Sequence, residues 1–188
     1  MTDQKFPIHS IESAPEQAKP LLEETHKSFG MIPNLERVMS SSPQLLSAYV
    51  KLWDDFSNTS LSEIEQQVVY QTANFINNCE YCVPWHTLLS KQAQMPEEVS
   101  SALREGQEIP DQKLMALHSY TKALIEHKGE VPPEVSESFY QVGYTSKNAL
   151  EVIMGLAIKL MSNYTNHIAE TPLDSVAQKY EWKKPPVE

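Results

Sequence analysis

SKNALEVIMGLAIKLMSNYTNHIAE, residues 146–170, is the longest stretch with one continuous periodicity in this chain of 188 residues. Apolar residues recur in it every three or four positions, the pattern of an amphipathic α-helix, and Pro172 follows as a stop signal. The stripe that we expect to be buried comprises Leu150, Ile153, Met154, Ala157, Leu160, Met161, Tyr164 and Ile168. The length of this helix predicts that it is the central helix of the core.

The segments on either side of this helix have the same 3.6-residue period, and none shows the alternation of a β-strand. Helices are expected within residues 15–29, 35–39, 43–56, 62–77, 96–106, 111–128 and 132–143. The Ser62-x-x-Glu65 pattern predicts a capping box at the start of one of them. The sequence therefore predicts an all-α bundle built as one domain. We divide it into an N-terminal helical arm over 1–40, the main helical domain over 41–174 and a polar C-terminal tail over 175–188.

The charge balance excludes several classes of function. Lys and Arg number 15 against 25 Asp and Glu, a formal net charge of −10 that repels nucleic-acid phosphates and anionic lipid headgroups. No apolar run approaches the length of a membrane span, and the first residues lack the features of a secretory signal. We therefore expect a cytoplasmic protein that binds neither nucleic acid nor membrane.

The two cysteines of the chain lie in one window, Asn78-Cys79-Glu80-Tyr81-Cys82-Val83-Pro84-Trp85-His86. In a reducing compartment, a pair at this spacing is more often redox-active or metal-binding than a structural bridge. Proline is comfortable only in the first turn of a helix, so Pro84 predicts that a helix begins within the motif. Cys79 is then expected to be the more exposed sulfur. His86 follows Cys82 by one helical turn and could accept a thiol proton.

Two alternatives to redox chemistry remain open for this window. A structural zinc site usually has four ligands, and the motif supplies three. The histidines that could complete it show no paired spacing: His9, His26, His118, His127 and His167. The cysteines could also be small hydrophobic residues of the core, although the Asn, Glu and Pro around them are unlike an apolar strip. We expect no resident metal.

The motif and its flanking residues resemble the carboxymuconolactone decarboxylase superfamily, in particular its AhpD-like, alkylhydroperoxidase-related branch. The stretches that carry this resemblance are 61–65, 78–82 with His86, 28–34, 161–167 and 171–174. The first two point to the AhpD-like branch. The other three are similar to its peroxidase-related subgroup, so the resemblance covers most of the chain.

The resemblance implies an all-α fold whose protomers associate into homotrimers or hexamers. It also implies a thiol-dependent peroxidase or disulfide oxidoreductase of antioxidant defence, in which Cys82 attacks a hydroperoxide, Cys79 resolves the product as a disulfide and His86 belongs to a proton relay. No cofactor is implied beyond this redox-active disulfide. The expected partners are an external lipoyl-type dithiol donor or a peroxiredoxin.

The chain departs from the family pattern at two positions of that relay. Gln67 stands where the family commonly has a glutamate, twelve residues before Cys79, and an amide cannot take up a proton as a carboxylate can. Tyr81 stands between the cysteines where well-characterised members have a histidine. Glu65 and Glu80 are the acidic residues nearest to these positions, and we count all four as candidate relay or pocket residues.

His167 interrupts the apolar stripe of the long helix. It could line the active pocket, meet a neighbouring subunit, or be a buried histidine satisfied by a hydrogen bond. Two further hypotheses from other classes stand beside the enzyme. One is a non-catalytic helical oligomer that uses the cysteine pair as a redox sensor, which Gln67 favours, and the other is a metal-binding module.

Overall fold

The computed structural model describes residues 6–186, and over that range it contains helices and no strand, which confirms the all-α prediction. Its α-helices are α1 (Lys19–Phe29), α2 (Asn34–Met39), α3 (Pro43–Ser57), α4 (Glu63–Ile76), α5 (Cys82–Gln92), α6 (Glu97–Glu105), α7 (Gln112–Glu126), α8 (Pro133–Gln141) and α9 (Ser146–Ala169). A 3₁₀-helix, η1 (Ser175–Tyr180), follows them. No helix of the described residues is both long enough and apolar enough to cross a membrane.

The predicted capping box opens α4. The Ser62 hydroxyl accepts a hydrogen bond from the backbone N–H of Glu65, and the Glu65 carboxylate accepts one from the backbone N–H of Ser62 at 2.8 Å. These two bonds satisfy backbone donors that the first turn of a helix leaves free. The start of α4 is therefore fixed by local sequence.

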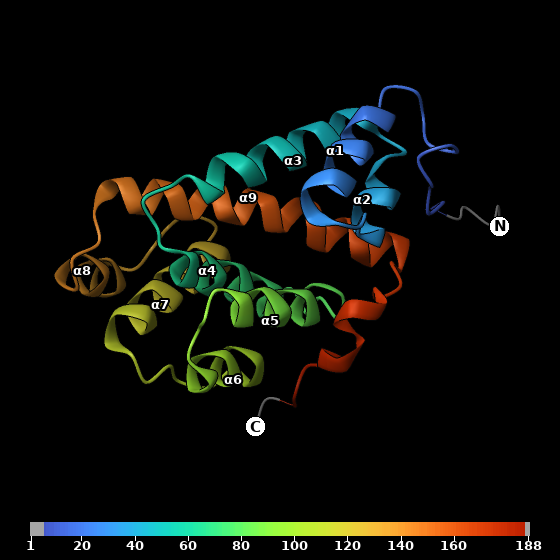
Figure 1. The fold of residues 1–188 in the computed structure, drawn as a ribbon. Coiled ribbons are helices and arrows are strands. Elements are labelled where there is room, and N and C mark those ends of the chain that lie inside the picture. Colours follow the sequence, from blue (N-terminus) through green and yellow to red (C-terminus); the bar gives the residue numbers. More distant parts are fainter. Residues whose placement is uncertain (1–5, 187–188) are drawn as a thin grey trace.

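α4 is the central helix of the fold. Every residue from Glu65 to Asn74 is buried, because α5, α6, α7 and α9 all pack against this helix. α3 runs alongside α9, and α1 and α2 lie against that pair near the C-terminal end of α9 (Figure 1). The expectation that residues 146–170 form the central helix is wrong, since α9 lies at the edge of the bundle with one face uncovered.

The buried face of α9 also differs from the predicted stripe. Most of the stripe is solvent-exposed: Leu150, Ile153, Ala157, Leu160, Tyr164 and Ile168. The face toward the core instead carries small and polar residues, including Gly155, Lys159, Asn163 and Asn166. A Cβ at Gly155 would lie 2.8 Å from side-chain atoms of Phe56 and Val69. This close approach of α3 and α4 to Gly155 sets the rotation of α9 about its own axis.

Both terminal segments pack on the core. Ala18 and Leu22 of the arm are fully buried, and residues 1–5 of the predicted arm lie outside the described residues. Trp182 in the predicted polar tail is 7% exposed, and its indole N–H donates to the carbonyl of Arg104 at 2.8 Å. The described part of the tail is thus anchored, while residues 187–188 lie outside the description.

Candidate active site

A tight turn between α4 and α5 positions the cysteine pair. Asn78 adopts a left-handed backbone conformation with φ of 53°, and the N–H of Cys79 then donates to the carbonyl of Asn74 at 3.0 Å. α5 begins at Cys82, which places Pro84 in its first turn and confirms the predicted helix start. The backbone N–H of Cys82 points back at the sulfur of Cys79, 3.4 Å away.

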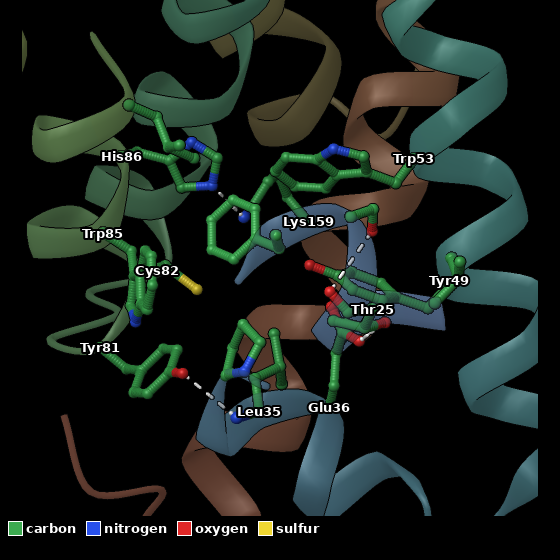
Figure 2. A pocket seen from close by; sticks show the side chains of 15 residues that line it. Thr25, Leu35, Glu36, Tyr49, Trp53, Tyr81, Cys82, Trp85, His86 and Lys159 are labelled. Atoms are coloured by element: carbon green, nitrogen blue, oxygen red, sulfur yellow. Dashed lines mark hydrogen bonds between the residues drawn. The ribbon is translucent and has the colours of Figure 1, made fainter. Parts of the chain in front are cut away.

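A cavity of about 190 Å³ opens beside Cys82. Its walls are mainly aromatic, and Figure 2 shows these rings around the sulfur of Cys82: Tyr49, Trp53, Tyr81 and Trp85. Phe29 of α1 also contributes to the wall. The polar groups that line the cavity come from four helices and comprise Thr25, Ser28, Glu36, His86 and Lys159. The N-terminal arm therefore forms one side of the candidate site.

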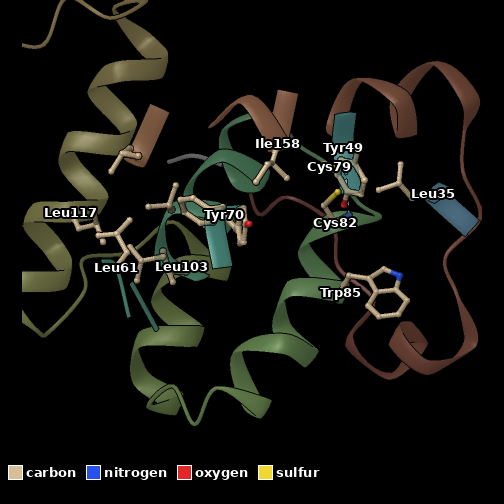
Figure 3. Packing of buried hydrophobic residues seen from close by; sticks show 14 of the residues in the cluster. Leu35, Tyr49, Leu61, Tyr70, Cys79, Cys82, Trp85, Leu103, Leu117 and Ile158 are labelled. Atoms are coloured by element: carbon tan, nitrogen blue, oxygen red, sulfur yellow. Dashed lines mark hydrogen bonds between the residues drawn. The ribbon is translucent and has the colours of Figure 1, made fainter. Parts of the chain in front are cut away.

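The prediction that Cys79 is the more exposed sulfur is wrong. Cys79 is 0% exposed and Cys82 is 2% exposed, and Cys82 is the one of the two that lines the cavity. Both cysteines sit among core side chains (Figure 3). The reason is that the left-handed turn at Asn78 directs Cys79 inward, where α9 covers it. The Asn166 amide of α9 donates to the sulfur of Cys82 at 3.2 Å and lies 3.9 Å from that of Cys79.

The two sulfurs are free thiols that differ in acidity. Burial by itself raises the pKa of Cys82, but the hydrogen bond from the Cys79 thiol and the positive charge of Lys159 outweigh it and lower the pKa to about 6. The same hydrogen bond, together with burial, raises the pKa of Cys79. Cys82 is therefore the thiolate near neutral pH, and Cys79 is the thiol behind it. This arrangement supports the predicted order, in which Cys82 attacks and Cys79 resolves.

His86 lies in a hydrogen-bonded row with Gln67 and Lys159. Its Nδ1 is 2.8 Å from Oε1 of Gln67, and its Nε2 is 2.8 Å from Nζ of Lys159. An amide oxygen only accepts, so Nδ1 carries the hydrogen and Nε2 accepts from the lysine. Burial and then the charge of Lys159 hold the pKa of His86 well below its usual value, so the imidazole is neutral. His86, the predicted base, thus contacts the Lys159 amine.

Three other predicted site residues do not line the cavity. Glu65 is at the cap of α4, bonded to Ser62, Tyr144 and Lys113, and does not line the cavity. Glu80 and His167 are exposed, and His167 Nε2 lies 3.3 Å from the carbonyl of Asn78. The structure brings together Cys82, Cys79, His86 and Gln67, with Tyr81 in the cavity wall.

Tyr81 and Trp85 both bond to Asp174, which is buried just after α9. The Tyr81 hydroxyl and the Trp85 indole N–H donate to the same oxygen of Asp174, the latter at 3.0 Å. The backbone N–H of Asn34, at the start of α2, donates to the other oxygen at 3.1 Å. One carboxylate thus ties α2, the cysteine turn and α5 together. This explains why the residue between the cysteines can be a tyrosine, whose hydroxyl serves the wall of the cavity.

Sequence reasoning missed three residues of the site: Lys159, Asn166 and Asp174. Lys159 is the one charge in the apolar run 152–161, and Asn166 lies seven positions, or two helical turns, further along the same face. A cation and an amide at this spacing inside an apolar helix were the available signal. Within residues 6–186, no group of three or more His, Cys, Asp or Glu side chains is arranged to hold a metal ion.

Neither a family model nor a curated protein matches the sequence. Solved structures do match. One is the alkylhydroperoxidase AhpD core of an uncharacterized peroxidase-related protein from Ralstonia eutropha JMP134, with a TM-score of 0.78 and 17% identity over 92% of this chain and 93% of that one. Another is an uncharacterized peroxidase-related protein from Silicibacter sp. TM1040, with a TM-score of 0.75 and 16% identity over 92% and 91% of the two chains.

The debrominase Bmp8, in complex with 2,3,4-tribromopyrrole, is similar to the same extent, with a TM-score of 0.75 and 14% identity over 95% of this chain and 96% of that one. Together these neighbours show that the chain has the AhpD-like fold, which confirms the expectation from the resemblance. The fold and the paired sulfurs define a helical protein with a buried dithiol site.

We expect Asp174→Asn to lower the free energy of unfolding by about 2 to 3 kcal/mol, because hydrogen bonds to a buried charged group are worth about that much and an amide opposes part of the donor set. Urea denaturation followed by circular dichroism measures the change. Asp111→Asn is the matched control, since Asp111 is an exposed cap of α7 and asparagine caps equally well. Equal stability of the two variants would contradict the role assigned to Asp174.

Proposed function

We propose that this protein is a thiol-dependent oxidoreductase of antioxidant defence that reduces small organic hydroperoxides with the Cys79–Cys82 pair. The observation that carries the proposal is the asymmetry of the two sulfurs. Cys82, with its lowered pKa, faces the cavity, and the Cys79 thiol lies behind it and donates to it. A thiolate at a substrate cavity with a second thiol in contact is what a two-step peroxide reduction needs.

The reaction balances with the residues at hand. The Cys82 thiolate attacks one peroxide oxygen, the O–O bond breaks, and the released alkoxide takes up a proton to leave as an alcohol. Cys82 becomes a sulfenic acid, which the Cys79 thiol converts to a disulfide with release of water. Two electrons pass from the dithiol to the peroxide. An external dithiol of the lipoyl type or a peroxiredoxin partner then exchanges with the disulfide.

The cavity supports an organic substrate with an apolar body. Engineered cavities of about 150 Å³ with apolar walls bind benzene, so the roughly 190 Å³ of this cavity accommodate a single substituted ring. The rings of Trp53 and Trp85 offer it aromatic surface. Because Cys82 is almost fully covered, a thin dithiol arm reaches it more readily than the surface of a folded protein does. We therefore favour cumene hydroperoxide over hydrogen peroxide as a probe and dihydrolipoamide as the donor.

One equivalent of cumene hydroperoxide should consume both thiols of the parent protein, and dimedone should trap a sulfenic acid on Cys82 in the Cys79→Ser variant. Thiol titration and mass spectrometry measure these outcomes. The Cys82→Ser variant should keep its thiol under the same conditions. Two free thiols in the treated parent, or a Cys82→Ser variant that consumes peroxide at the parent rate, would refute the proposed roles. Many turnovers with dihydrolipoamide separate an enzyme from a sensor, which oxidises once per chain.

A second candidate activity is reductive debromination of a small aromatic compound. The aromatic walls around Cys82 favour it, and Bmp8, a debrominase with the same fold, binds a brominated pyrrole. The Cys82 thiolate would take the bromine, the ring carbon would gain a proton, and Cys79 would displace bromide to form the disulfide. Each turnover consumes one aryl bromide and two thiols and yields one C–H bond, one disulfide and one bromide ion.

2,3,4-Tribromopyrrole supplied together with dihydrolipoamide tests this candidate. The expected result is one bromide ion per disulfide formed, measured by ion chromatography, with no release above the dithiol blank from Cys82→Ser. Bromide release by the parent no faster than the blank would eliminate debromination and leave the hydroperoxide proposal intact.

We also propose that the chain forms a homotrimer or hexamer through the outer face of α9. Leu150, Ile153, Leu160, Tyr164 and Ile168 are between 51% and 68% exposed and lie on one side of the helix. A contiguous apolar stripe of this length is typical of an interaction surface, and a second copy of the chain offers the same stripe.

Leu160→Glu should convert the oligomer to a monomer, because a carboxylate in the middle of the stripe cannot be buried against a second copy without a partner. Size-exclusion chromatography with light scattering measures the mass. Gln107→Glu adds the same charge at an exposed position beyond α6 and should leave the oligomer unchanged. A monomeric parent protein would overturn this assignment.

A further inference from the structure

Lys159 is a cation inside the helical core. It lies on the inner face of α9 and is 1% exposed, one of the largest fully buried side chains of the described residues. Its ammonium lines the same cavity as Cys82 and lies 2.8 Å from Nε2 of His86 (Figure 2). It also lies 5.2 Å from the ring centre of Tyr70. The neighbours that it contacts are thus a neutral imidazole and an aromatic face.

A buried ammonium without a counter-charge is strongly unfavourable, by several kcal/mol in proteins. Burial accordingly lowers the pKa of Lys159, and the negative charge of Cys82 is the first of the effects that oppose this shift. The counter-ion of the buried lysine is therefore a sulfur. An apolar side chain of similar shape would fill the same space at lower cost, so this position is explained by what the charge does for the thiolate.

We propose that Lys159 is the electrostatic partner that holds Cys82 as a thiolate, and that it donates the proton of the reaction in place of a relay carboxylate, which this chain lacks. The first half concerns the resting protein alone. The second half rests on the proposed peroxide reduction. There the Cys82 thiolate, the hydroperoxide and the Lys159 ammonium give the sulfenic acid, the alcohol and a neutral amine, which regains its proton from water.

The other ionisable groups around the two sulfurs leave this role to Lys159. The groups that face the site are Cys79 and Tyr81 in the turn, His86 on α5, Tyr70 on α4, Tyr49 on α3, Glu36 on α2 and Asp174 after α9. Burial raises the pKa of each of the three tyrosines and of Glu36, and lowers the pKa of His86. Among these described groups, Lys159 carries the positive charge that acts on Cys82.

Gln67 is consistent with this arrangement. Its amide oxygen accepts the Nδ1 hydrogen of His86 and leaves Nε2 free to accept from Lys159. A carboxylate at position 67 would favour a charged His86 imidazole. The hydrogen on Nε2 of that imidazole would then point at the Lys159 ammonium. The amide keeps the imidazole neutral and oriented, so Gln67 and His86 position Lys159.

The test is the pH dependence of Cys82 alkylation by iodoacetamide, followed by mass spectrometry and normalised to the plateau at high pH. Two variants remove the charge in different ways: Lys159→Met keeps the shape, and Lys159→Gln keeps a hydrogen-bond donor toward His86. In both, the midpoint should move from about 6 toward the ordinary thiol value of about 8.5, which lowers the normalised rate at pH 7 roughly tenfold or more. Lys147→Met, an exposed lysine on the same helix, should keep the parent midpoint.

The melting temperature gives a second readout. Because Lys159→Met removes a buried charge, this variant should melt at no lower temperature than the parent protein. Loss of a lysine with a purely structural role would instead lower the melting temperature. A parent-like midpoint in both variants overturns the proposal, and so does a parent-like midpoint in Lys159→Gln alone, since the hydrogen bond would then suffice. Alkylation needs no peroxide, so a shifted midpoint in a protein inert to hydroperoxides refutes the proposed function and leaves the role of Lys159 standing.

Discussion

The close packing of Phe56 and Val69 against Gly155 constrains the whole bundle, because it fixes which face of α9 points inward. With its polar side toward α4 and α5, α9 brings Lys159 to His86 and Asn166 to the sulfur of Cys82. That rotation turns Leu150, Leu160 and the rest of the apolar stripe toward solvent. A helix rotated to bury its apolar stripe would give a better monomeric core and no site. The same constraint therefore creates the candidate active site and the outer apolar surface.

Asp174 gives the cavity its second fixed point. Its carboxylate collects donors from the start of α2, from the residue between the cysteines and from the first turn of α5. These segments are far apart in the sequence, and two of the stretches that carry the family resemblance, 28–34 and 171–174, meet at this carboxylate. We infer that these flanking stretches resemble the family because they support the wall of the cavity. The cysteine motif carries the proposed redox chemistry.

The sequence patterns correctly predicted the features that depend on neighbouring residues. The capping box at Ser62 and the helix that begins inside the motif, as Pro84 required, depend on neighbouring residues and were confirmed. The face of α9 and the exposure of Cys79 depend on contacts between distant segments, and both predictions were wrong. Periodicity sets the spacing of a helical stripe, but packing at Gly155 sets its direction. The partnership of Lys159 with His86 joins residues on different helices, and no spacing rule reports it.

The burial of the two sulfurs has a consequence for how an oxidised pair would be reduced in the proposed reaction. A thiol that enters through the cavity meets Cys82 and must expel Cys79, whose burial disfavours the departing thiolate. Attack on Cys79 would expel Cys82, whose thiolate the charge of Lys159 favours, but Cys79 is fully covered. α9 covers it, and the cysteine turn is tied to α9 by the bond from the Asn77 amide to Asn163. In the proposed reaction, the enclosure of Cys79 would therefore disfavour regeneration of the dithiol, and a reductant would require this turn to open.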